Sequence, residues 1–374
     1  MEFVVNKSDL VRELGLSQGV VEKKTTIPIL SNVLIEAHGD RINLTATDLE
    51  LGIRCTCPAK VKKEGAGTIP ARKLLDYARL LPDAEVNVKF LENHWASITC
   101  GRSRTKMAGM SRESFPELPE MPEAISEIPV GLLSSMISRT SFAISMEESR
   151  FTLNGALLLL SGDGMAMVAT DGHRLAYVEK AMDMNGSAKS AKGFRALIPK
   201  KAMGEIVKLA EESGPELKVV FAGDENHLFF RFGERLLITR KLTGNFPDYE
   251  RVLPKDNTNI AKLHKEEIRS AIERVSQFAD ERSRAIRVQF GQGEVRVFSS
   301  SVETGESEES VPTEYAGPDL EIGFNAQYLL DFLRAIGQDE VSFALKDQKS
   351  AGELRPASEE AKDHYRYVVM PMRI

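Results

Sequence analysis

The stretch that most suggests chemistry is Thr-Asp-Gly-His-Arg, residues 170–174. A hydrolase could use His173 as a general base oriented by Asp171, but it would also need an activated nucleophile. The chain has no Gly-x-Ser-x-Gly elbow, phosphate-binding loop or His-Glu-x-x-His motif, and its six histidines are scattered. We therefore expect a structural or binding loop at these residues, with no catalytic residue, cofactor or metal. The related sequence Thr-Ala-Thr-Asp at residue 45 favours a structural role for the shared Thr-Asp pair.

The C-terminal segment YVVMPMRI, residues 367–374, is unusual because it is apolar almost to its end. Chain termini are more often polar and frayed. This segment could complete a sheet. Its Met370-Pro371-Met372 could also line an adaptable apolar groove, since methionine side chains repack around varied ligands. The two interpretations are compatible, and both remain open.

An internal repeat predicts the elements that position these residues. Three segments each read as a short strand followed by a helix that is entered through proline or asparagine. They are TIPARKLLDYARLLP from residue 68, ALIPKKAMGEIVKLAEES from residue 196 and EIGFNAQYLLDFLRAIG from residue 321. The entry residues Pro70, Pro199 and Asn325 recur at nearly equal intervals, and an alternating strand follows each segment. Such recurrence indicates one supersecondary unit present three times.

The other half of the unit also recurs, as a strand, an amphipathic helix and paired strands. These copies begin at Phe3, Glu127 and Ala261. In the first copy, Ser8 or Asp9 is expected to cap the helix. Proline-rich segments at 115–129 and 246–257 separate the copies. We predict an α+β fold of three tandem domains, with boundaries at 1–120, 128–250 and 253–374.

Composition narrows the class of protein. Hydrophobic residues make up 42% of the 374 residues and charged residues 28%, which is typical of a globular chain and too apolar for disorder. No apolar run approaches the ~18 residues of a membrane helix, and the N-terminus lacks the apolar core of a secretion signal. We therefore expect no membrane partner. Cys55 and Cys57 alternate as strand neighbours, and Cys100 makes the number odd, so we also expect reduced thiols and a cytoplasmic location.

Basic side chains recur on one side of predicted helices although the formal net charge is −6. Arg72 and Arg79 share a face of one helix, and Lys201 and Lys208 share a face of another. Each pair alone could be an ordinary solvated face. Repetition of such pairs in an acidic protein favours a surface for anions, most naturally the phosphate backbone of a nucleic acid. No base-reading motif is present, so binding should be independent of sequence.

Together these segments resemble the bacterial sliding clamp family, the β subunits of the replicative DNA polymerase III holoenzyme. The resemblance covers the whole chain and is carried by IPILSNVLIEA, LTATDLE, IPARKLLDYARLLP, FPELPE, VATDGHRLA, FPDYERVLP, EIGFNAQYLLDFL and YVVMPMRI. It implies three tandem DNA-clamp domains, each with two helices packed on antiparallel sheets. It further implies a head-to-tail homodimeric ring, without a cofactor, that encircles duplex DNA. Such a ring tethers polymerase subunits and the clamp loader, which bind it through short linear motifs.

The resemblance also assigns site residues. The implied partner-peptide pocket consists of Leu153, Thr170, Gly172, His173, Arg174, Leu175, Pro247, Arg251, Val252, Asn325, Tyr328, Val368, Val369, Met370, Pro371, Met372 and Arg373. The implied DNA contacts are Lys24, Arg72, Arg150, Phe151, Lys200 and Lys201. At the ring joint, Lys73, Tyr77, Leu81, Arg102 and Arg104 of one subunit would face Gln277, Phe278, Glu303, Glu306 and Glu308 of the other.

A second class of function is a DNA-processing enzyme such as a nuclease. A two-metal nuclease needs clustered carboxylates, and the acidic run from Glu303 to Glu309 could be taken for such a cluster. Cleavage of duplex DNA in the presence of a divalent metal separates this alternative from a non-enzymatic ring.

Overall fold

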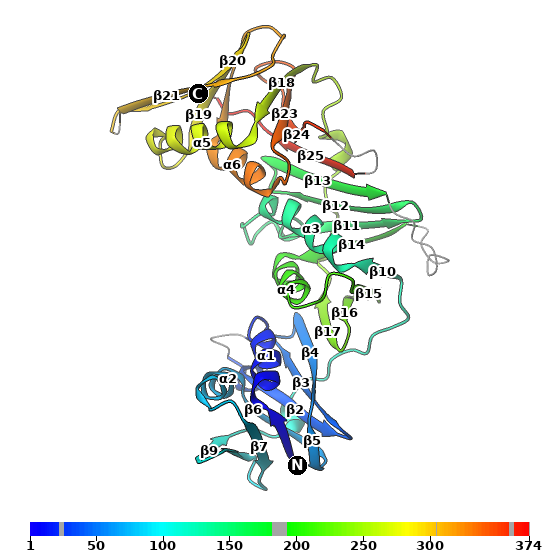
Figure 1. Ribbon diagram of the computed structural model, residues 1–374. Coiled ribbons are helices and arrows are strands. Elements are labelled where there is room, and N and C mark those ends of the chain that lie inside the picture. Colours follow the sequence, from blue (N-terminus) through cyan, green and yellow to red (C-terminus); the bar gives the residue numbers. More distant parts are fainter. Residues whose placement is uncertain (22–25, 182–192, 304, 359–362, 374) are drawn as a thin grey trace. The chain divides into compact units, whose positions relative to one another are not determined.

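The computed structural model describes residues 1–21, 26–181, 193–303, 305–358 and 363–373. Over these residues the expected order recurs three times: a strand and a helix, further strands, a second helix, and three closing strands (Figure 1). The described helices are α1 (Lys7–Ser17), α2 (Ala71–Leu80), α3 (Val130–Thr140), α4 (Lys200–Glu211), α5 (Lys265–Val275) and α6 (Ala326–Ala335). None of these helices has the length and apolar character required to cross a membrane. The repeat inferred from the sequence is therefore present as a repeat of structure.

The second helix of each repeat begins where its entry residue predicts. Pro70 is the N-cap residue of α2, and the Asn325 side chain accepts hydrogen bonds from the N–H groups of the first turn of α6. The predicted cap of α1 is wrong. This helix begins at Lys7 with Asn6 as its N-cap residue, so Asp9 lies inside the first turn, where a carboxylate is favoured by the helix dipole.

The described chain forms two compact units, one of residues 1–134 and 201–241 and the other of residues 135–200 and 242–374. We call them unit 1 and unit 2. The middle repeat contributes strands to both units, because a single sheet runs from one repeat into the next in each case. This continuity explains how three sequence repeats form two compact bodies.

Unit 1 contains two sheets. In order across the first, the strands are β5 (Lys60–Lys63), β1 (Glu2–Asn6), β7 (Glu85–Phe90), β8 (Trp95–Cys100) and β9 (Ser103–Ala108). In order across the second, they are β10 (Ser126–Pro129), β15 (Lys218–Gly223), β16 (His227–Phe232), β17 (Arg235–Arg240), β4 (Leu51–Pro58), β3 (Arg41–Thr47), β2 (Asn32–His38) and β6 (Gly65–Pro70). The antiparallel pair β4–β17 joins the first repeat to the second, and we call it the first seam.

Unit 2 is built in the same way. Its eight-stranded sheet is β14 (Phe194–Pro199), β11 (Gly155–Ser161), β12 (Gly164–Thr170), β13 (Arg174–Ala181), β25 (Asp363–Val369), β24 (Gly352–Pro356), β23 (Glu340–Leu345) and β18 (Asn259–His264). Its four-stranded sheet is β21 (Gly305–Pro312), β20 (Glu294–Ser301), β19 (Ala285–Gly291) and β22 (Leu320–Asn325). The antiparallel pair β13–β25 joins the second repeat to the third, and we call it the second seam.

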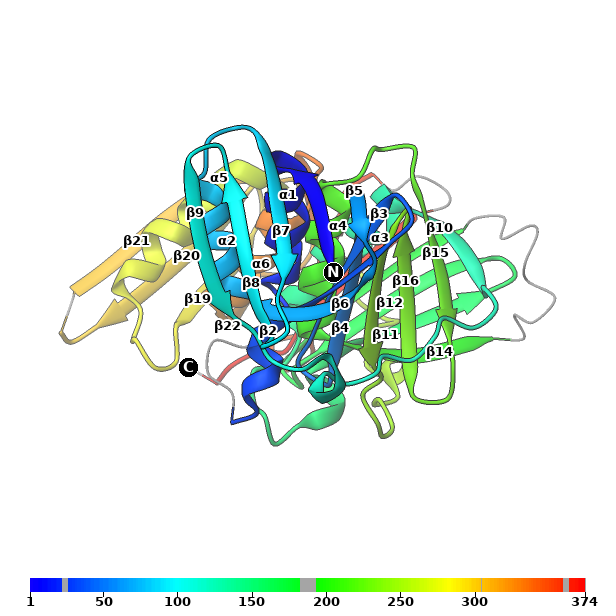
Figure 2. The ribbon, with the colours of Figure 1, turned by 90° about the horizontal axis from the view of Figure 1, so that it is seen from below.

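The helices pack on the sheets through apolar stripes. In α2 the residues Ala71, Leu74, Leu75 and Ala78 are buried, while Arg72 and its neighbours on the other side are exposed. This is the periodicity of an amphipathic helix. Helices α1 and α2 lie side by side in unit 1, and α5 and α6 do so in unit 2 (Figures 1 and 2). The polar sides of these helices are therefore available for binding.

The cysteines are part of the core. Cys55, Cys57 and Cys100 are free and buried. Burial, with the nearby acidic side chains, raises the pKa of the Cys57 thiol to about 12. This thiol stays protonated at neutral pH and therefore lacks the reactivity of a catalytic cysteine.

Candidate functional site

A cavity of about 110 Å³ lies beside the second seam, within unit 2. Strands β12, β13 and β25 supply its sheet wall, and the turns around Leu153 and Tyr249 supply the opposite wall. Its lining residues are Leu153, Thr170, Gly172, Arg174, Leu175, Pro247, Tyr249, Val252, Val368 and Met370. Whole small-molecule sites usually measure ~300–1,000 Å³, so this cavity has room for anchoring side chains of a larger ligand.

The turn from Thr170 to Arg174 is held by its own polar groups. The Thr170 hydroxyl donates to the carbonyl oxygen of Arg174 (2.6 Å) and accepts from the Gly172 N–H (3.1 Å). The Asp171 carboxylate accepts from the N–H groups of His173 (2.9 Å) and Arg174 (3.0 Å). Gly172 has φ +89°, a conformation that favours glycine. Asp171 therefore organises the turn, and its contacts give it no role as the partner of a catalytic histidine.

Arg174 connects three parts of unit 2. Its guanidinium donates to Asp171 (3.0 Å), to Asp331 on α6 (2.6 Å) and to the carbonyl oxygen of Phe142 (2.6 Å). Its Cζ atom also lies 4.3 Å from the centre of the Tyr328 ring. Burial opposes the charge of Arg174, yet the surrounding oxygens, including those of Tyr367 and Asp331, raise its pKa. The side chain is thus a fixed, charged wall of the cavity.

The C-terminal segment completes a sheet, and of Met370, Pro371 and Met372 only Met370 lines the cavity. Val368 pairs with Leu175 in the seam, so the segment completes the sheet. The Met370 N–H then donates to the carbonyl oxygen of His173 (2.9 Å), and the Met372 N–H donates to that of Gly323 (2.8 Å). These bonds hold the partly exposed Met370 side chain at the cavity.

The remaining members of the implied pocket do not line this cavity. Arg251 is exposed and pairs with Asp248 (2.7 Å), and the Asn325 side chain caps α6. The Tyr328 ring contacts the Arg174 guanidinium, as described above, and does not itself line the cavity. His173, Val369, Pro371, Met372 and Arg373 also lie outside the lining.

Tyr249 lines the cavity but was missed from the sequence. It stacks on Tyr177 with ring centres 5.8 Å apart. The sequence does place this aromatic residue within the segment FPDYERVLP. A linker with several apolar residues is expected to turn some of them toward the sheet that it crosses, and Tyr249 could have been predicted on that basis.

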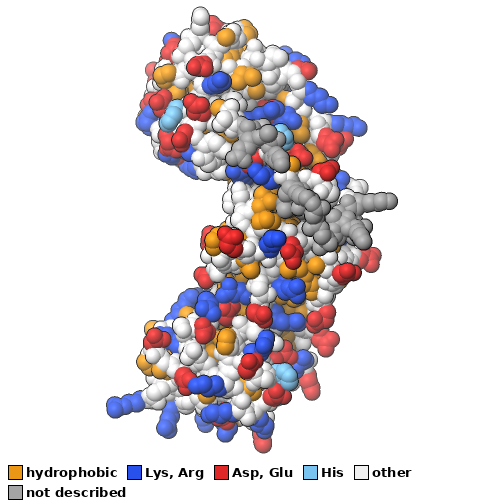
Figure 3. All heavy atoms as spheres, turned by 45° about the vertical axis from the view of Figure 1, so that its right-hand side comes forward, with side chains coloured by type: hydrophobic (Ala, Val, Ile, Leu, Met, Phe, Trp, Pro, Cys, Tyr) orange, Lys and Arg blue, Asp and Glu red, His pale blue; other side chains and the backbone are white. Residues whose placement is uncertain are grey.

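Some implied DNA contacts are exposed cations on the helices. In unit 1, Arg72 and Lys201 are exposed, and Lys201 contacts Asp48. In unit 2, Phe151 is 71% exposed and lies next to Arg150. Burial and the nearby Arg174 lower the pKa of Lys200. Lys24 lies outside the described residues. Figure 3 shows one face of the molecule, on which lysine and arginine are interspersed with acidic side chains.

Two strands that carry implied joint residues are sheet edges. Strand β9 carries Arg104 at the edge of its sheet, and Arg102 immediately precedes this strand. Strand β21 carries Glu306 and Glu308 at the edge of the four-stranded sheet, after Glu303 (Figure 2). Gln277 and Phe278 belong to the turn after α5. These edges combine unpaired backbone with charges of opposite sign.

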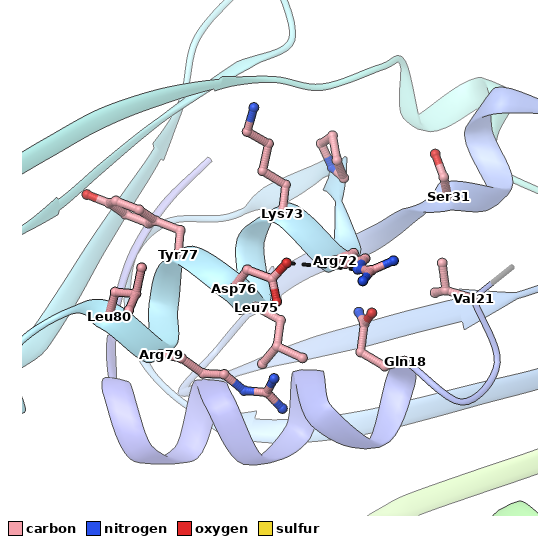
Figure 4. Close-up of a pocket in the computed structure, with 11 residues that line it drawn as sticks. Gln18, Val21, Ser31, Arg72, Lys73, Leu75, Asp76, Tyr77, Arg79 and Leu80 are labelled. Carbon is pink, nitrogen blue, oxygen red and sulfur yellow. Dashed lines mark ion pairs between the residues drawn. The ribbon is translucent and has the colours of Figure 1, made fainter. Parts of the chain in front are cut away.

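Helix α2 borders a large open hollow in unit 1, about 870 Å³, that contains Arg72, Lys73 and Tyr77 (Figure 4). Arg72 forms a long ion pair with Asp76 (3.9 Å). Leu81 was expected at the joint but is buried, with 5% of its surface exposed, whereas the adjacent Leu80 is 85% exposed. Leu80 ends the exposed side of the helix and was not among the residues expected at the joint.

Comparison with known proteins gives three tandem matches to one family. The models for the DNA polymerase III beta subunit match as its N-terminal domain over residues 1–119, its central domain over 127–248 and its C-terminal domain over 250–373. The beta sliding clamp of Pseudomonas aeruginosa is 35% identical over 377 aligned positions, and the match covers all of both chains.

Solved structures agree with these matches along the whole chain. The crystal structure of the DNA polymerase III subunit beta from Pseudomonas aeruginosa has a TM-score of 0.93 at 35% identity, with both chains fully covered. The C. crescentus beta sliding clamp has a TM-score of 0.92 at 34% identity, again with full coverage. That structure has polyethylene glycol bound at a candidate beta-motif tethering region.

Proposed function

Because the chain belongs to the DNA polymerase III beta subunit family, the bacterial sliding clamps, we propose how its own residues perform the function of a clamp. The protein is a processivity factor and not an enzyme: it binds duplex DNA and tethers polymerases. The observation that carries this function is the match of three consecutive clamp domains along one chain. The nuclease alternative is thereby set aside.

The cavity at the second seam is the proposed site for partner peptides. Leu153, Leu175, Val368 and Met370 offer apolar surface, while Arg174 and the Thr170 turn offer fixed polar groups. A short linear motif with a glutamine and apolar side chains fits a site of this size and character. Two or three buried anchors of this kind typically give affinities near micromolar, about −8 kcal/mol.

The tail gives a direct test of this site. Deletion of residues 370–374 removes Met370 from the cavity, at a cost of roughly 1–2 kcal/mol for each buried apolar side chain that contacts the peptide. We expect calorimetric titration with a motif peptide to show about fivefold to thirtyfold weaker binding, with Met370→Ala intermediate. A thermal melt is the control, because the tail also completes a sheet. Unchanged peptide affinity in a folded deletion variant would refute the assignment.

DNA binding is proposed to be topological and independent of sequence. The exposed cations Arg72, Lys200 and Lys201, with Arg150 and Phe151, would contact phosphates weakly, so enclosure and not affinity would retain the ring. Lys24 belongs to the same proposed set. A ring loaded on closed circular DNA should dissociate once the circle is cut. Equal retention on circular and linear DNA would contradict enclosure.

The ring is proposed to close as a head-to-tail homodimer. The basic edge of β9 and the acidic edge of β21 are complementary, and Tyr77, Phe278 and the exposed Leu80 supply apolar surface. Exposed ion pairs contribute only ~0–1 kcal/mol each, so the apolar residues should dominate. Arg104→Glu should weaken the dimer measurably at low salt, and sedimentation at several protein concentrations measures it. A dissociation constant that does not change would count against this joint.

We also propose that the three clamp domains have the boundaries 1–120, 128–250 and 253–374. The proposed location of the protein is the cytoplasm. Buried, free cysteines are consistent with a reducing compartment. Fluorescence of a tagged chain in bacterial cells tests the location, and the position of the nucleoid is where a replication protein should appear.

A further inference from the structure

The first seam has a cavity of its own, distinct from the sites described above. It measures about 450 Å³ and lies within unit 1, between strands β2–β4 and the linker after Phe115. This volume falls within the ~300–1,000 Å³ of typical ligand sites. Its lining residues are Leu34, Glu36, Asn43, Thr45, Arg54, Arg112, Phe115, Pro116, Glu117, Leu118 and Glu120.

The register of the sheet explains why the floor of this cavity is polar. Leu34 pairs with Thr45, and Thr45 pairs with Arg54, so these three side chains lie in one row. Glu36 and Asn43 pair in the next row on the same face. The floor therefore presents a block of polar groups beside one leucine.

The second repeat has apolar residues in the matching row. Aligning the Thr-Asp turns of the two repeats places Leu157, Val168 and Tyr177 at the corresponding positions. Tyr249 of the following linker stacks on Tyr177 and covers that row. In the first repeat the corresponding linker residue is Leu118, which has no aromatic ring to cover Arg54. The space left uncovered is the polar cavity.

Two polar atoms of this floor lack hydrogen-bond partners among the described residues, Thr45 Oγ1 and Arg54 Nε. Thr45 is only 3% exposed. The other groups are partly paired: Arg112 with Glu36 (3.3 Å) and Arg54 Nη2 with Glu120 (3.6 Å). The floor therefore has one N–H donor, Arg54 Nε, and one neighbouring hydroxyl, that of Thr45, without partners. Both atoms are buried, and a buried polar atom without a hydrogen bond is costly.

We propose that this cavity binds a peptide segment through a carboxamide side chain, that of asparagine or glutamine. The carboxamide oxygen accepts from Arg54 Nε, and its NH₂ group donates to Thr45 Oγ1. A neutral group fits because three carboxylates and two guanidiniums already line the site, so another carboxylate would be repelled. Leu34 and Phe115 accommodate an adjacent apolar side chain. The choice of a peptide rests on the proposed function, since the repeat-related cavity is the proposed peptide pocket.

The test uses the full chain with ¹³C-labelled leucine methyl groups and two small probes. The neutral probe is acetyl-asparaginyl-leucine N-methylamide, and the anionic probe of the same shape is acetyl-aspartyl-leucine N-methylamide, so the asparagine side chain supplies the one primary carboxamide. We expect the neutral probe to shift the Leu34 and Leu118 signals saturably in the millimolar range, and the anionic probe to bind several-fold more weakly. Leu153 and Leu175 report the other cavity separately, so failure of one site is distinguishable from failure of the other.

Variants connect the shifts to the proposed atoms. Thr45→Val keeps the shape and removes the hydroxyl, and should weaken the neutral probe about fivefold, the usual effect of one neutral hydrogen bond. Thr99→Val, the same change on β8 outside the cavity, should leave the affinity unchanged. Native signals of Leu10 and Leu14, which are buried in unit 1 outside the cavity, and an unaltered melt show that Thr45→Val is folded. The proposal is overturned by the absence of shifts at Leu34 and Leu118, by equal or tighter binding of the anionic probe, or by full affinity in Thr45→Val.

Discussion

The two seams join neighbouring repeats in the same way, yet the same position is filled at one seam and open at the other. Gly52 in the first seam and Leu175 in the second occupy corresponding positions, each paired across to the adjoining repeat. A Cβ atom on Gly52 would lie 2.9 Å from Leu118 Cδ1, so the linker fills this point itself. At the second seam Leu175 lines a cavity. At this one pair of positions, therefore, the first seam is filled by its linker, whereas the second seam lines a cavity.

The polar contacts of the seams also differ. In the first seam, Glu13 on α1 receives two hydrogen bonds from Arg235 on β17, of 2.8 and 2.7 Å, and only 2% of the Glu13 side chain is exposed. In the second, Arg139 on α3 meets Asp363 on β25 at 3.4 Å, with about a fifth of each side chain exposed. The ion pair between the first helix and the closing strand is therefore more buried in the first seam than in the second, where the Arg174–Asp331 pair also joins the two repeats.

The largest expected effect comes from breaking the buried pair. Arg235→Met leaves the Glu13 carboxylate buried with Arg12 as its remaining partner, and should lower the free energy of unfolding by about 3 kcal/mol. Arg139→Met, the matched change at the second seam, should cost about 1 kcal/mol or less. Urea unfolding of both variants checks this difference. Equal losses would show that burial does not distinguish the two seams.

A smaller effect is expected from giving the first seam the residue of the second. Gly52→Leu should collide with Leu118 and cost about 1–3 kcal/mol, as overpacked cores do. Adding Leu118→Ala should restore part of that loss, so that the double variant is more stable than the sum of the two single changes predicts. Thermal melts of the three variants measure the coupling. Strict additivity would mean that Leu118 does not occupy the space.

A still smaller change in the free energy of unfolding is expected when the first seam is exposed to acid. Burial alone would raise the pKa of Glu13, but hydrogen bonds and charges from Arg235 and Arg12 outweigh it and lower the pKa below its ordinary 4.5. A lowered carboxyl pKa contributes stability that is present above about pH 4.5 and is lost as the pH falls through the folded-state value. The loss of stability from neutral pH to about pH 3 should therefore be less steep for Glu13→Gln than for the unchanged chain, as measured by urea unfolding at each pH. Parallel curves would contradict this role for Glu13.

The smallest expected effect is on peptide affinity, from a change at Arg251, outside the cavity of the second seam. Arg251 is 85% exposed on its side chain and does not line the cavity. Arg251→Ala should therefore change motif-peptide affinity by less than about 0.5 kcal/mol. Tyr249→Ala should cost more, because this ring forms a wall of the cavity. Calorimetry on both variants checks the ranking, and a large effect of Arg251→Ala would extend the site beyond the cavity.

Much of the architecture could be predicted from the sequence because it depends on local signals. Pro70, Pro199 and Asn325 recur at nearly equal intervals, and the helices that follow begin immediately after them. Buried stripes such as Leu74 and Leu75 follow from helical periodicity. The cap of α1 was misplaced because Asn6, Ser8 and Asp9 all have side chains suited to capping, and the sequence alone does not rank them.

The sequence by itself determined the repeat, the fold class, the family and most of the residues that line the cavity at the second seam. Only the tertiary structure decided which of those residues share a surface. Asn325 is used as a cap, Leu81 is buried where Leu80 is exposed, and Tyr249 enters the cavity although no motif marked it. The difference between the filled and the open position of the seams also appeared only in three dimensions. Its physical reason is that periodicity fixes which side of an element a residue occupies, whereas the space left between elements depends on side chains from distant segments, such as Leu118 over Gly52.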